Sequence, residues 1–432
     1  MAEVFPLERI PAPVRAIAAR LRDAGHETWF VGGAVRDVLL ERLRPGTRRR
    51  GGDFDITTSA TPDVVRTLFR RTIPVGIEHG TVAVLDEAGG AHEVTTFRRD
   101  VETDGRHAVV QFGVSVEEDL ARRDFTINAI AVHSASGELL DPFGGREDLA
   151  AGVVRAVGDA AQRFLEDRLR ILRALRFAAV LGFEIEPGTW RAITAQAGEL
   201  AHLSRERVRE EWLKSLAVAL PGSAMRLWSR AGVLGEVWPE LASLAGAEFS
   251  RLDALDLADG EHAAGVADSV GSPDAAAVPD PVLVTAAALW QAGAGSAAAW
   301  AAVQRLRFSN KDSARVRALV LALGDQLPAP AQTRDVRRWL ARHRAIALDV
   351  IAVSEPRVRR PDVRAAVRAV EAAGDALSLR ELAVTGEDLK AAGLAAGKGM
   401  GDVLRRLLEE VLDEPALNTR DALLRRAREL GA

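Results

Sequence analysis

The pattern of apolar and polar residues divides the chain into two parts of different character. Over about the first 140 residues, short apolar runs with strand-like alternation are mixed with segments in which apolar residues recur every three to four positions. From Asp148 onward the strand pattern nearly disappears, and the helical period continues to the end of the chain. The pattern therefore predicts an N-terminal α/β or α+β head followed by helical domains.

The predicted elements of the head are bounded by glycine, proline and capping residues. A helix over 11–25 is expected to end at Gly25, and Thr61 is the expected N-cap of a helix over 61–71. A further helix is predicted over 34–43. The segments predicted as strands are 27–33, 53–60, 81–89, 92–97, 109–114 and 125–133.

The rest of the chain is predicted to be almost entirely helical. The segment 245–281 is rich in Ala, Gly, Asp and Ser and is expected to be a variable connection. Near the C-terminus, a loop over 391–401 is expected to precede a last long helix over 402–414. The other helices expected in this part cover 160–182, 188–201, 205–220, 222–234 and 281–293.

The composition excludes several classes of chemistry. The 432 residues include no cysteine and no tyrosine, which excludes disulfides, thiolate metal sites, cysteine nucleophiles and phenol general acids. Of the 57 Lys and Arg residues, all but four are arginine. This side chain is the best suited to form paired hydrogen bonds with phosphates and base edges. A GC-rich genome explains the same excess equally well.

The sequence also shows no sign of export or membrane insertion. The N-terminal MAEVFPLERIP has no basic flank followed by an apolar core, and no uncharged apolar run approaches the ~20 residues of a membrane span. We therefore expect a cytoplasmic protein. The net charge of -4 does not exclude a polyanionic partner, because binding depends on where the charges lie.

Four motifs carry residues suited to catalysis or ligand binding. The first is a strand–glycine–helix junction at Val31–Asp37. Gly32 and Gly33 let backbone N–H groups approach an anion, and the N-terminus of the following helix favours negative charge. Arg36, in the first turn of that helix, is within reach of a triphosphate. Most junctions of this kind are plain turns, so the motif alone leaves a structural explanation open.

The second motif places two carboxylates on one face of a predicted strand. Asp53 and Asp55 alternate with Phe54, whose side chain is expected in the core. Carboxylates suit Mg²⁺, and two such ions activate an attacking hydroxyl and neutralise a leaving pyrophosphate. A solvated strand face is the alternative for this pair taken alone. Glu93, on another predicted strand, is a candidate third carboxylate.

The third motif is the basic pair Arg122 and Arg123, just before the apolar segment 125–133. Arginines in this position are suited to clamp the triphosphate of a nucleotide. A surface turn explains the same residues equally simply.

The fourth motif is a helical segment in which charged residues recur every three positions. Asp167 and Arg170 are neighbours on the surface of the predicted helix, and Arg173 and Arg176 continue the step. A carboxylate beside a guanidinium offers acceptors and donors to the Watson–Crick edge of a base. A solvated, salt-bridged helix face is the alternative.

In their order and spacing these motifs resemble the class II tRNA nucleotidyltransferases, the family of bacterial CCA-adding enzymes and poly(A) polymerases. The resemblance is close from Phe30 to Lys214, and the segment from Thr385 to Leu424 resembles the C-terminal part of the family. The segments that carry it are VGGAVRD, DFDITTSATPDVV, RTIPVGIEHGTVAVL, EVTTFR, EEDLARRDFTINAIA, LDPFGG, EDRLRILRALRF and RERVREEWLK.

The resemblance implies an α+β fold with a polymerase-beta-like nucleotidyltransferase head that contains a mixed sheet and helices. The implied domains are the catalytic head (1–140), a helical neck for base recognition (141–205), a helical body (206–330) and a helical tail that binds tRNA (331–432). The implied activity is template-independent addition of C, C and A to the 3′ end of tRNA from CTP and ATP, with release of pyrophosphate and with Mg²⁺ as cofactor. The implied partners are the acceptor arm of tRNA, CTP and ATP.

The same resemblance assigns a role to each motif residue. Asp53 and Asp55 would be the catalytic metal ligands. Asp167 and Arg170 would pair with the base, so that the protein selects the nucleotide, and the stretch 206–211 would brace their helix. The residues assigned to nucleotide binding are Gly32, Gly33, Arg36, Arg122, Arg123, Asp167, Arg170, Arg173 and Arg176.

Two departures from the family pattern leave the choice of activity open. The segment 99–112 resembles the flexible loop that switches the family from C to A addition, but it is slightly short and lacks a tyrosine. Trp290 and Gln291 stand where some relatives carry a His-Asp pair, which predicts no phosphohydrolase activity. The alternatives are an A-adding or CC-adding enzyme, a bacterial poly(A) polymerase, and a non-catalytic RNA-binding protein, the last disfavoured by the intact carboxylate pair.

Overall fold

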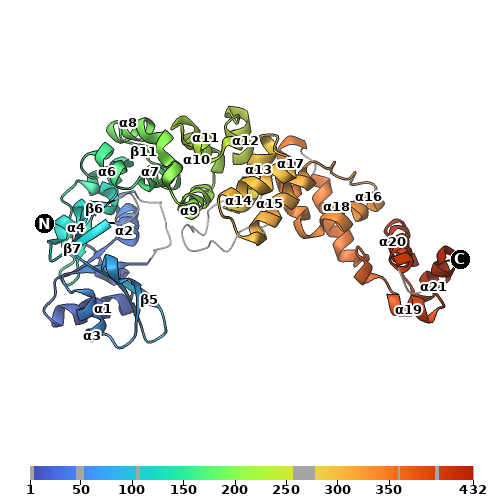
Figure 1. Ribbon diagram of the computed structural model, residues 1–432, viewed down its shortest axis with the longest axis horizontal. Helices are drawn as coiled ribbons and strands as arrows, with labels where there is room; N and C mark the ends of the chain where they lie inside the picture. Colours follow the sequence, from blue (N-terminus) through green and yellow to red (C-terminus); the bar gives the residue numbers. More distant parts are fainter. Residues whose placement is uncertain are drawn as a thin grey trace. The chain divides into compact units, whose positions relative to one another are not determined.

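The chain folds into two compact units (Figure 1). The first unit is formed by residues 1–253, 259–284 and 302–308, and the second by residues 254–258, 285–301 and 309–432. The computed structural model describes residues 4–44, 53–103, 108–255, 278–358, 361–394 and 398–431. In this part of the chain, no helix is long and apolar enough to cross a membrane.

A seven-stranded mixed sheet forms the head of the first unit, as the sequence predicts. The strands lie in the order β3-β4-β5-β2-β1-β8-β9. β2 and β5 are parallel, and the other neighbouring pairs are antiparallel. The strands are β1 (Thr28–Val31), β2 (Asp55–Thr58), β3 (Thr72–Gly76), β4 (Thr81–Leu85), β5 (Ala91–Thr96), β8 (Ala131–His133) and β9 (Leu139–Leu140).

The strand that follows the DFD motif is shorter than predicted. β1 and β2 are antiparallel, and Val31 opposite Asp55 is the last pair of their ladder. After Val31 the chain turns at Gly32, whose φ is 90°. The ladder ends there, so β2 begins at Asp55 and not at Asp53. Phe54 is nevertheless buried, as the alternation predicts.

The segment 125–133, predicted as one strand, is divided into two elements. Thr126–Asn128 form a 3₁₀ turn, η3, and only β8 is a strand. The hydroxyl of Thr126 donates to the carboxylate of Asp148 at 2.6 Å. This buried hydrogen bond connects the turn to α5 (Gly145–Ala151).

Helices and a separate hairpin complete the head. Thr61 directly precedes a helix as predicted, but its side chain makes no capping hydrogen bond. The sequence analysis missed α4, although Ser115 and Glu118 form a capping box in front of it. The hairpin strand β6 was likewise not predicted. These elements are α1 (Ala12–Asp23), α2 (Gly33–Leu43), α3 (Pro62–Leu68), α4 (Val116–Ala121), β6 (Arg98–Thr103) and β7 (Ala108–Phe112), with 3₁₀ turns η1 (Leu7–Arg9) and η2 (Ile77–His79).

The remainder of the first unit is mainly helical, with one short parallel pair of strands, β10 (Val153–Val154) and β11 (Glu184–Ile185). Residues 256–277, in the predicted connection, lie outside the described residues. The connection also contains a helix that was not predicted, α12 (Gly246–Asp253). The other helices are α5 (Gly145–Ala151), α6 (Ala160–Glu166), α7 (Leu169–Leu181), α8 (Pro187–Gln196), η4 (Ala197–His202), α9 (Arg205–Leu216), α10 (Pro221–Arg230), α11 (Val233–Val237) and η5 (Pro239–Leu241).

The predicted continuous helix over 160–182 is broken between α6 and α7. Asp167 has extended backbone angles, φ -152° and ψ 103°, and its carboxylate accepts a hydrogen bond from the backbone N–H of Leu169 at 3.0 Å. Aspartate is prone to this because its short side chain competes with the helix for nearby N–H groups. Asp167 and Arg170 are therefore not neighbours within one helix, which corrects the geometry inferred from their spacing.

Three buried tryptophans fix α9 within the first unit. The ring of Trp212 on α9 packs on Trp228 and Trp238, with centroid distances of 5.3 and 5.2 Å. Each of these large rings is completely buried, and such packing dominates the stability of a core. α9 also packs against α7, which carries Arg170, Arg173 and Arg176.

The second unit consists of helices, as predicted. The helix predicted over 402–414 starts earlier, at Lys398, and it is followed by a further helix, α21. Arg337 is buried and donates to the backbone oxygens of Leu412 and Asp413, where α20 ends. The helices after α12 are α13 (Pro281–Gln291), α14 (Ser296–Arg305), α15 (Asn310–Leu323), α16 (Thr333–His343), η6 (Arg344–Ile346), α17 (Ala347–Val358), α18 (Pro361–Ala373), η7 (Leu379–Glu381), α19 (Gly386–Ala391), α20 (Lys398–Asp413), η8 (Pro415–Leu417) and α21 (Arg420–Gly431).

Candidate active site

A cavity of about 500 Å³ in the first unit gathers most of the predicted site residues. It contains every predicted nucleotide-binding residue and Asp55, whereas Asp53 and Glu93 do not line it. Five lining residues were not predicted: Asp124, Asn128, Leu169, Phe177 and Arg207. The predicted residues that line the cavity are Gly32, Gly33, Arg36, Asp55, Arg122, Arg123, Asp167, Arg170, Arg173 and Arg176.

The carboxylate of Asp55 lies directly against the β1–α2 turn. A Cβ atom at Gly32 would meet Asp55 Oδ2 at 2.4 Å, and Gly32 also has a positive φ of 90°. Both facts require glycine, because a side chain at this position would be strained and would collide with the carboxylate. The glycine thus allows the start of α2 and the acidic residue to share one edge of the sheet.

Negative charge accumulates around Asp55. Burial raises its pKa to about 6, the charge of Arg123 opposes this shift, and Glu93 and Asp53 add to it. Glu93 is close because Val94, the next residue, pairs with Ile56 in the parallel β2–β5 ladder. The raised pKa therefore reflects mainly burial, with smaller contributions from the two neighbouring carboxylates. A carboxyl group with a raised pKa in a cavity is a common feature of functional sites.

The donor set around Asp55 fits a divalent cation. Carboxylate oxygens are the hard ligands that Mg²⁺ prefers. Among the described residues, no group of three or more acidic, His or Cys side chains is arranged to hold a metal ion. Mg²⁺ commonly takes one or two carboxylates together with water and substrate phosphates. The part of Glu93 as a third ligand stays a prediction.

Arg36 is held in one orientation by hydrogen bonds from two sides. Its Nε donates to Asp37 at 2.8 Å, and its Nη1 donates to Asn128 Oδ1 at 2.9 Å. The amide of Asn128 donates to Asp124 at 3.1 Å, and Arg173 Nε donates to the other oxygen of Asp124 at 2.7 Å. A continuous polar chain therefore connects α2, η3 and α7.

Asp124 stays ionised although it is buried. Burial alone would raise its pKa, but the charge of Arg173 and hydrogen bonds from Asn128, Arg173 and the backbone N–H of Phe125 lower the pKa to about 2. The carboxylate thus stays charged at every pH at which a nucleotide-binding protein operates. Its charge compensates that of Arg173 in a site otherwise rich in arginine.

We expect the free energy of unfolding to depend on pH through Asp124. The folded pKa lies below the unfolded value of about 3.9, so the stabilisation is complete above pH 4 and is lost as the pH falls toward 2. Replacement of Asp124 by asparagine should cost about 2 kcal/mol at pH 7. Urea unfolding of both proteins at pH 7 and pH 3 should show a smaller difference at pH 3, and an equal difference at both would contradict the assignment.

The predicted basic pair directly follows α4. Arg122 Nε donates to Asp119 at 2.9 Å, and Arg123 Nη2 lies 3.6 Å from the same carboxylate. Asp119 is fully buried and was not identified from the sequence. Arg123 also donates to the backbone oxygen of Asn128 at 3.4 Å. These contacts hold both arginines at the cavity wall.

The two residues expected to recognise the base lie at the break between α6 and α7. Asp167 accepts a hydrogen bond from Arg207 Nη2 at 2.6 Å. Arg170 Nη1 donates to Glu166 at 2.7 Å, and its Nη2 donates to the backbone oxygen of Arg122 at 2.9 Å. Both side chains line the cavity, and each is oriented by its own partner.

α9 contributes the supports that the sequence analysis expected from 206–211. Glu211 is 4% exposed and accepts a hydrogen bond from Arg176 Nε at 2.6 Å, with Arg173 Nη1 at 3.9 Å. Arg207, from the same turn region of α9, contacts Asp167. One acidic and one basic side chain of α9 thus hold Arg176 of α7 and Asp167 at the α6–α7 break.

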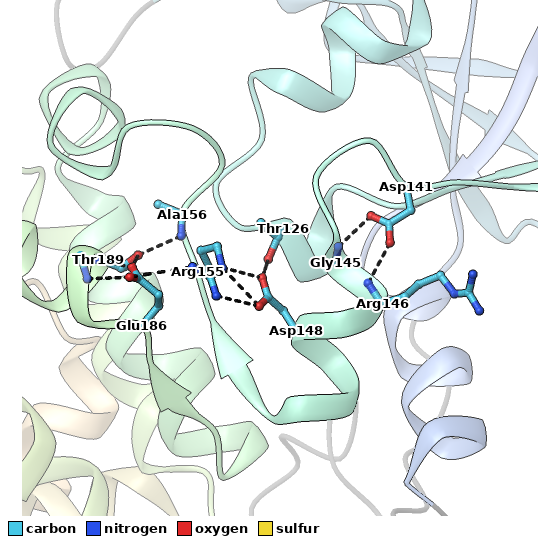
Figure 2. Close-up of polar contacts among 10 residues, drawn as sticks. Thr126, Asp141, Gly145, Arg146, Asp148, Arg155, Ala156, Glu186 and Thr189 are labelled. Carbon is cyan, nitrogen blue, oxygen red and sulfur yellow. Dashed lines mark hydrogen bonds and ion pairs between the residues drawn. The ribbon is translucent and has the colours of Figure 1, made fainter.

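A second polar network holds η3 behind the cavity (Figure 2). Asp148 accepts hydrogen bonds from the hydroxyl of Thr126 and from Arg155 Nε and Nη2. Arg155 also lies 3.8 Å from Glu186, which caps α8 through the backbone N–H groups of Gly188 and Thr189. The turn that carries Asn128 is therefore anchored to the helices behind it.

Sequence profiles of three protein families match the chain. They are the Poly A polymerase head domain over residues 28–155, the "Probable RNA and SrmB-binding site of polymerase A" over 182–244, and tRNA nucleotidyltransferase domain 2 over 283–427. The CCA-adding enzyme of Leuconostoc mesenteroides is 48% identical over 232 residues, which are 53% of this chain and 55% of that protein. That of Bacillus velezensis is 44% identical over 248 residues, 56% and 60% of the two chains.

A solved structure extends the likeness to nearly the whole chain. The crystal structure of the Bacillus stearothermophilus CCA-adding enzyme in complex with CTP is 32% identical, covers 96% of both chains and has a TM-score of 0.77. The chain belongs to the class II tRNA nucleotidyltransferase family. The chain spans about half the length of the curated relatives it matches. The likeness over nearly the whole chain rests on the crystal structure, whose sequence identity is lower.

All five lining residues that sequence reasoning missed lay inside segments that carry the resemblance. Asp124 and Asn128 both lay inside the third motif, but Asp124 was given no role and Asn128 was treated as part of the strand predicted over 125–133. Arg207 lay within the bracing stretch 206–211 without a role of its own. Phe177 ended the fourth motif, where an apolar residue at helical spacing gave no sign that it would face arginines. The adjacency of Asp124 to the basic pair was the signal that could have found it.

Proposed function

We propose that this chain adds C, C and A to the 3′ end of tRNA from CTP and ATP without a nucleic-acid template and releases pyrophosphate, in the cytoplasm. The observation that carries the proposal is the cavity itself. It joins the carboxylate of Asp55 to seven arginines and to Asp167. The positive charges of these arginines match the phosphates of a nucleoside triphosphate.

The head residues are proposed to bind the triphosphate and the metal. Asp53 and Asp55 would hold Mg²⁺, which supplies charge neutralisation of the phosphates and activation of the attacking 3′-hydroxyl when bound. Arg36 and Arg123, both held by neighbouring hydrogen bonds, would orient the phosphates for in-line attack at the α-phosphorus. The backbone at Gly32 and Gly33 leaves room for the triphosphate beside Asp55.

The α6–α7 break is proposed to select the base. Asp167 offers carboxylate oxygens to the exocyclic amino group that cytosine and adenine share, and Arg170 offers donors to ring acceptors. Uracil and guanine present an oxygen where cytosine and adenine present this amino group, so a carboxylate disfavours them. The protein side chains would thus replace a template strand.

A bacterial poly(A) polymerase is the second candidate, because one matching family profile is described as a poly(A) polymerase head domain. The same head serves both activities. The segment RTIPVGIEHGTVAVL favours CCA addition, and the curated relatives with the matches cited above are CCA-adding enzymes. The polymerase would extend any RNA with A, whereas a CCA-adding enzyme stops after one A.

One assay separates these activities. The purified chain receives tRNA without its 3′ end, tRNA that ends in C-C, or an unrelated RNA, with CTP and ATP separately and together. Addition of C, C and one A to tRNA that then stops supports the proposal. A long A tail on any RNA shows the polymerase, A added only to tRNA that ends in C-C shows an A-adding enzyme, and no incorporation of CTP contradicts the proposal.

Replacement of Arg170 by alanine should blur the choice between CTP and ATP. The variant keeps the metal ligands and the phosphate-binding arginines, so it should still incorporate nucleotides, but misincorporation should rise by about tenfold or more since a directional donor is lost. The measurement is the ratio of kcat/KM for CTP and ATP on each tRNA. Alanine at Arg168, which contacts Glu199 outside the cavity, is the control.

A further inference from the structure

The ring of Phe177 lies at the centre of the arginine cluster. Three guanidinium groups lie over this single ring, with Cζ at 4.1 Å from the centroid for Arg176, 5.1 Å for Arg36 and 5.4 Å for Arg173. Phe177 is 6% exposed and lines the cavity. A position on α7 that reads as an ordinary core residue is therefore surrounded by cations.

These three arginines come from two different elements. Arg36 is on α2, whereas Arg173 and Arg176 are on α7 with the ring. Like charges gathered this closely repel one another, and each has a different acidic or amide partner: Asp37 and Asn128, Asp124, or Glu211. The ring is the contact that all three share. Its negative face attracts a cation, and the attraction is stronger where water is excluded.

The orientation of the ring is itself fixed. Phe125 packs edge-on against Phe177, with the centroids 5.7 Å apart and the planes at 80°. Phe125 is completely buried, and its backbone N–H binds Asp124. The ring therefore cannot turn freely, and the guanidinium planes that lie over it are held with it.

We propose that Phe177 is a positioning residue for nucleotide binding, whose aromatic face holds Arg36, Arg173 and Arg176 in the arrangement that receives the triphosphate. This inference rests on the proposed function. The ring itself makes no bond to the nucleotide. It lowers the cost of gathering three cations before the anion arrives, which is pre-organisation of the site.

The first test replaces Phe177 by leucine, which keeps an apolar side chain but removes the π face. The dissociation constants for CTP and ATP, measured by calorimetry without tRNA so that no nucleotide is consumed, should both rise about tenfold. The ratio of the two constants should stay unchanged, because the base is proposed to be read by Asp167 and Arg170 and not by the three arginines over the ring. Phe183→Leu is the matched control, since Arg44 lies over that ring at 5.4 Å outside the cavity.

A second test separates the π face from packing. Site-specific incorporation of mono-, di- and trifluorinated phenylalanine at position 177 weakens the negative face of the ring with little change in its size. The dissociation constants should rise with each fluorine, by about threefold or more in total. A double-mutant cycle with Arg176→Met should show a smaller effect of Phe177→Leu when Arg176 is absent.

The outcomes distinguish this inference from the proposed function. If the wild-type chain adds C, C and A but the fluorinated series shows no trend in affinity, the positioning role of Phe177 is refuted while the function stands. Equal losses in Phe177→Leu and Phe183→Leu would refute it as well. If the wild-type chain binds neither CTP nor ATP, both the function and the inference fail.

Discussion

Replacement of Asp55 by asparagine is expected to lower nucleotide incorporation at least a thousandfold. Asparagine keeps the shape of the side chain but removes the charge that the proposed Mg²⁺ site needs, and electrostatic stabilisation is usually the largest contribution to phosphoryl transfer. The measurement is single-turnover incorporation of CTP into tRNA without its 3′ end. Retention of more than a tenth of the wild-type rate would falsify the assignment of Asp55.

The same substitution should leave the fold intact or stabilise it. The raised pKa of Asp55 means that its charged form is disfavoured by burial and by Glu93 and Asp53. In the absence of a cation at pH 7, the neutral amide removes this cost, so the free energy of unfolding should rise by about 1–2 kcal/mol. A large loss of stability would instead attribute the lost activity to unfolding.

Asp63→Asn is a control for this experiment. Asp63 is in the first turn of α3, its side chain is 91% exposed, and it does not line the cavity. The substitution is again aspartate to asparagine, and Asp63 lies in the same head as Asp55. Incorporation by this variant should match the wild type, which excludes a general effect of one lost negative charge.

The order of short motifs along the chain predicted most of the residues that line the cavity. Gly32 lies in a turn, Arg36 at the start of a helix and Asp55 at the start of a strand. Such local features leave a direct pattern in the sequence. Their convergence did not follow from these local patterns, because it depends on the antiparallel pairing of β1 with β2. The α+β head and the helical remainder followed from the change in periodicity.

The residues that escaped prediction depend on contacts between distant segments. Asn128 supports Arg36 from 92 positions away along the chain, and Arg207 reaches Asp167 across 40. No periodicity encodes such pairs, because they arise only when α9 and η3 pack against α2 and α7. The break at Asp167 was missed because a helical period on both sides hides one residue whose side chain competes for an N–H group.

Replacement of Gly32 by alanine is expected to reduce kcat/KM by about a hundredfold, although only one methyl group is added. The new Cβ would lie 2.4 Å from Asp55 Oδ2, so the carboxylate or the β1–α2 turn must move. A displacement near 1 Å at the reacting centre costs about two orders of magnitude in rate. Steady-state incorporation of CTP measures this loss.

Gly25→Ala separates the collision from backbone strain. Gly25 has nearly the same positive φ, 88° against 90°, but a Cβ there would have no atom within 4 Å. Both substitutions should therefore cost at least about 1 kcal/mol of stability through their positive φ, and more at Gly32, whose ψ of -162° lies outside the αL region. Only Gly32→Ala should lose activity. Comparable losses in both variants would show that strain, and not contact with Asp55, is responsible.

A double-mutant cycle then tests whether Gly32 acts through Asp55. If the added methyl group harms the reaction only by displacing this carboxylate, Gly32→Ala should cost little further activity in an Asp55→Asn background. Independent effects would multiply and would point to the N–H groups at the start of α2 as the damaged element. Because Gly32 and Asp55 belong to separate sequence motifs, strong coupling between them would show that the two motifs build a single site.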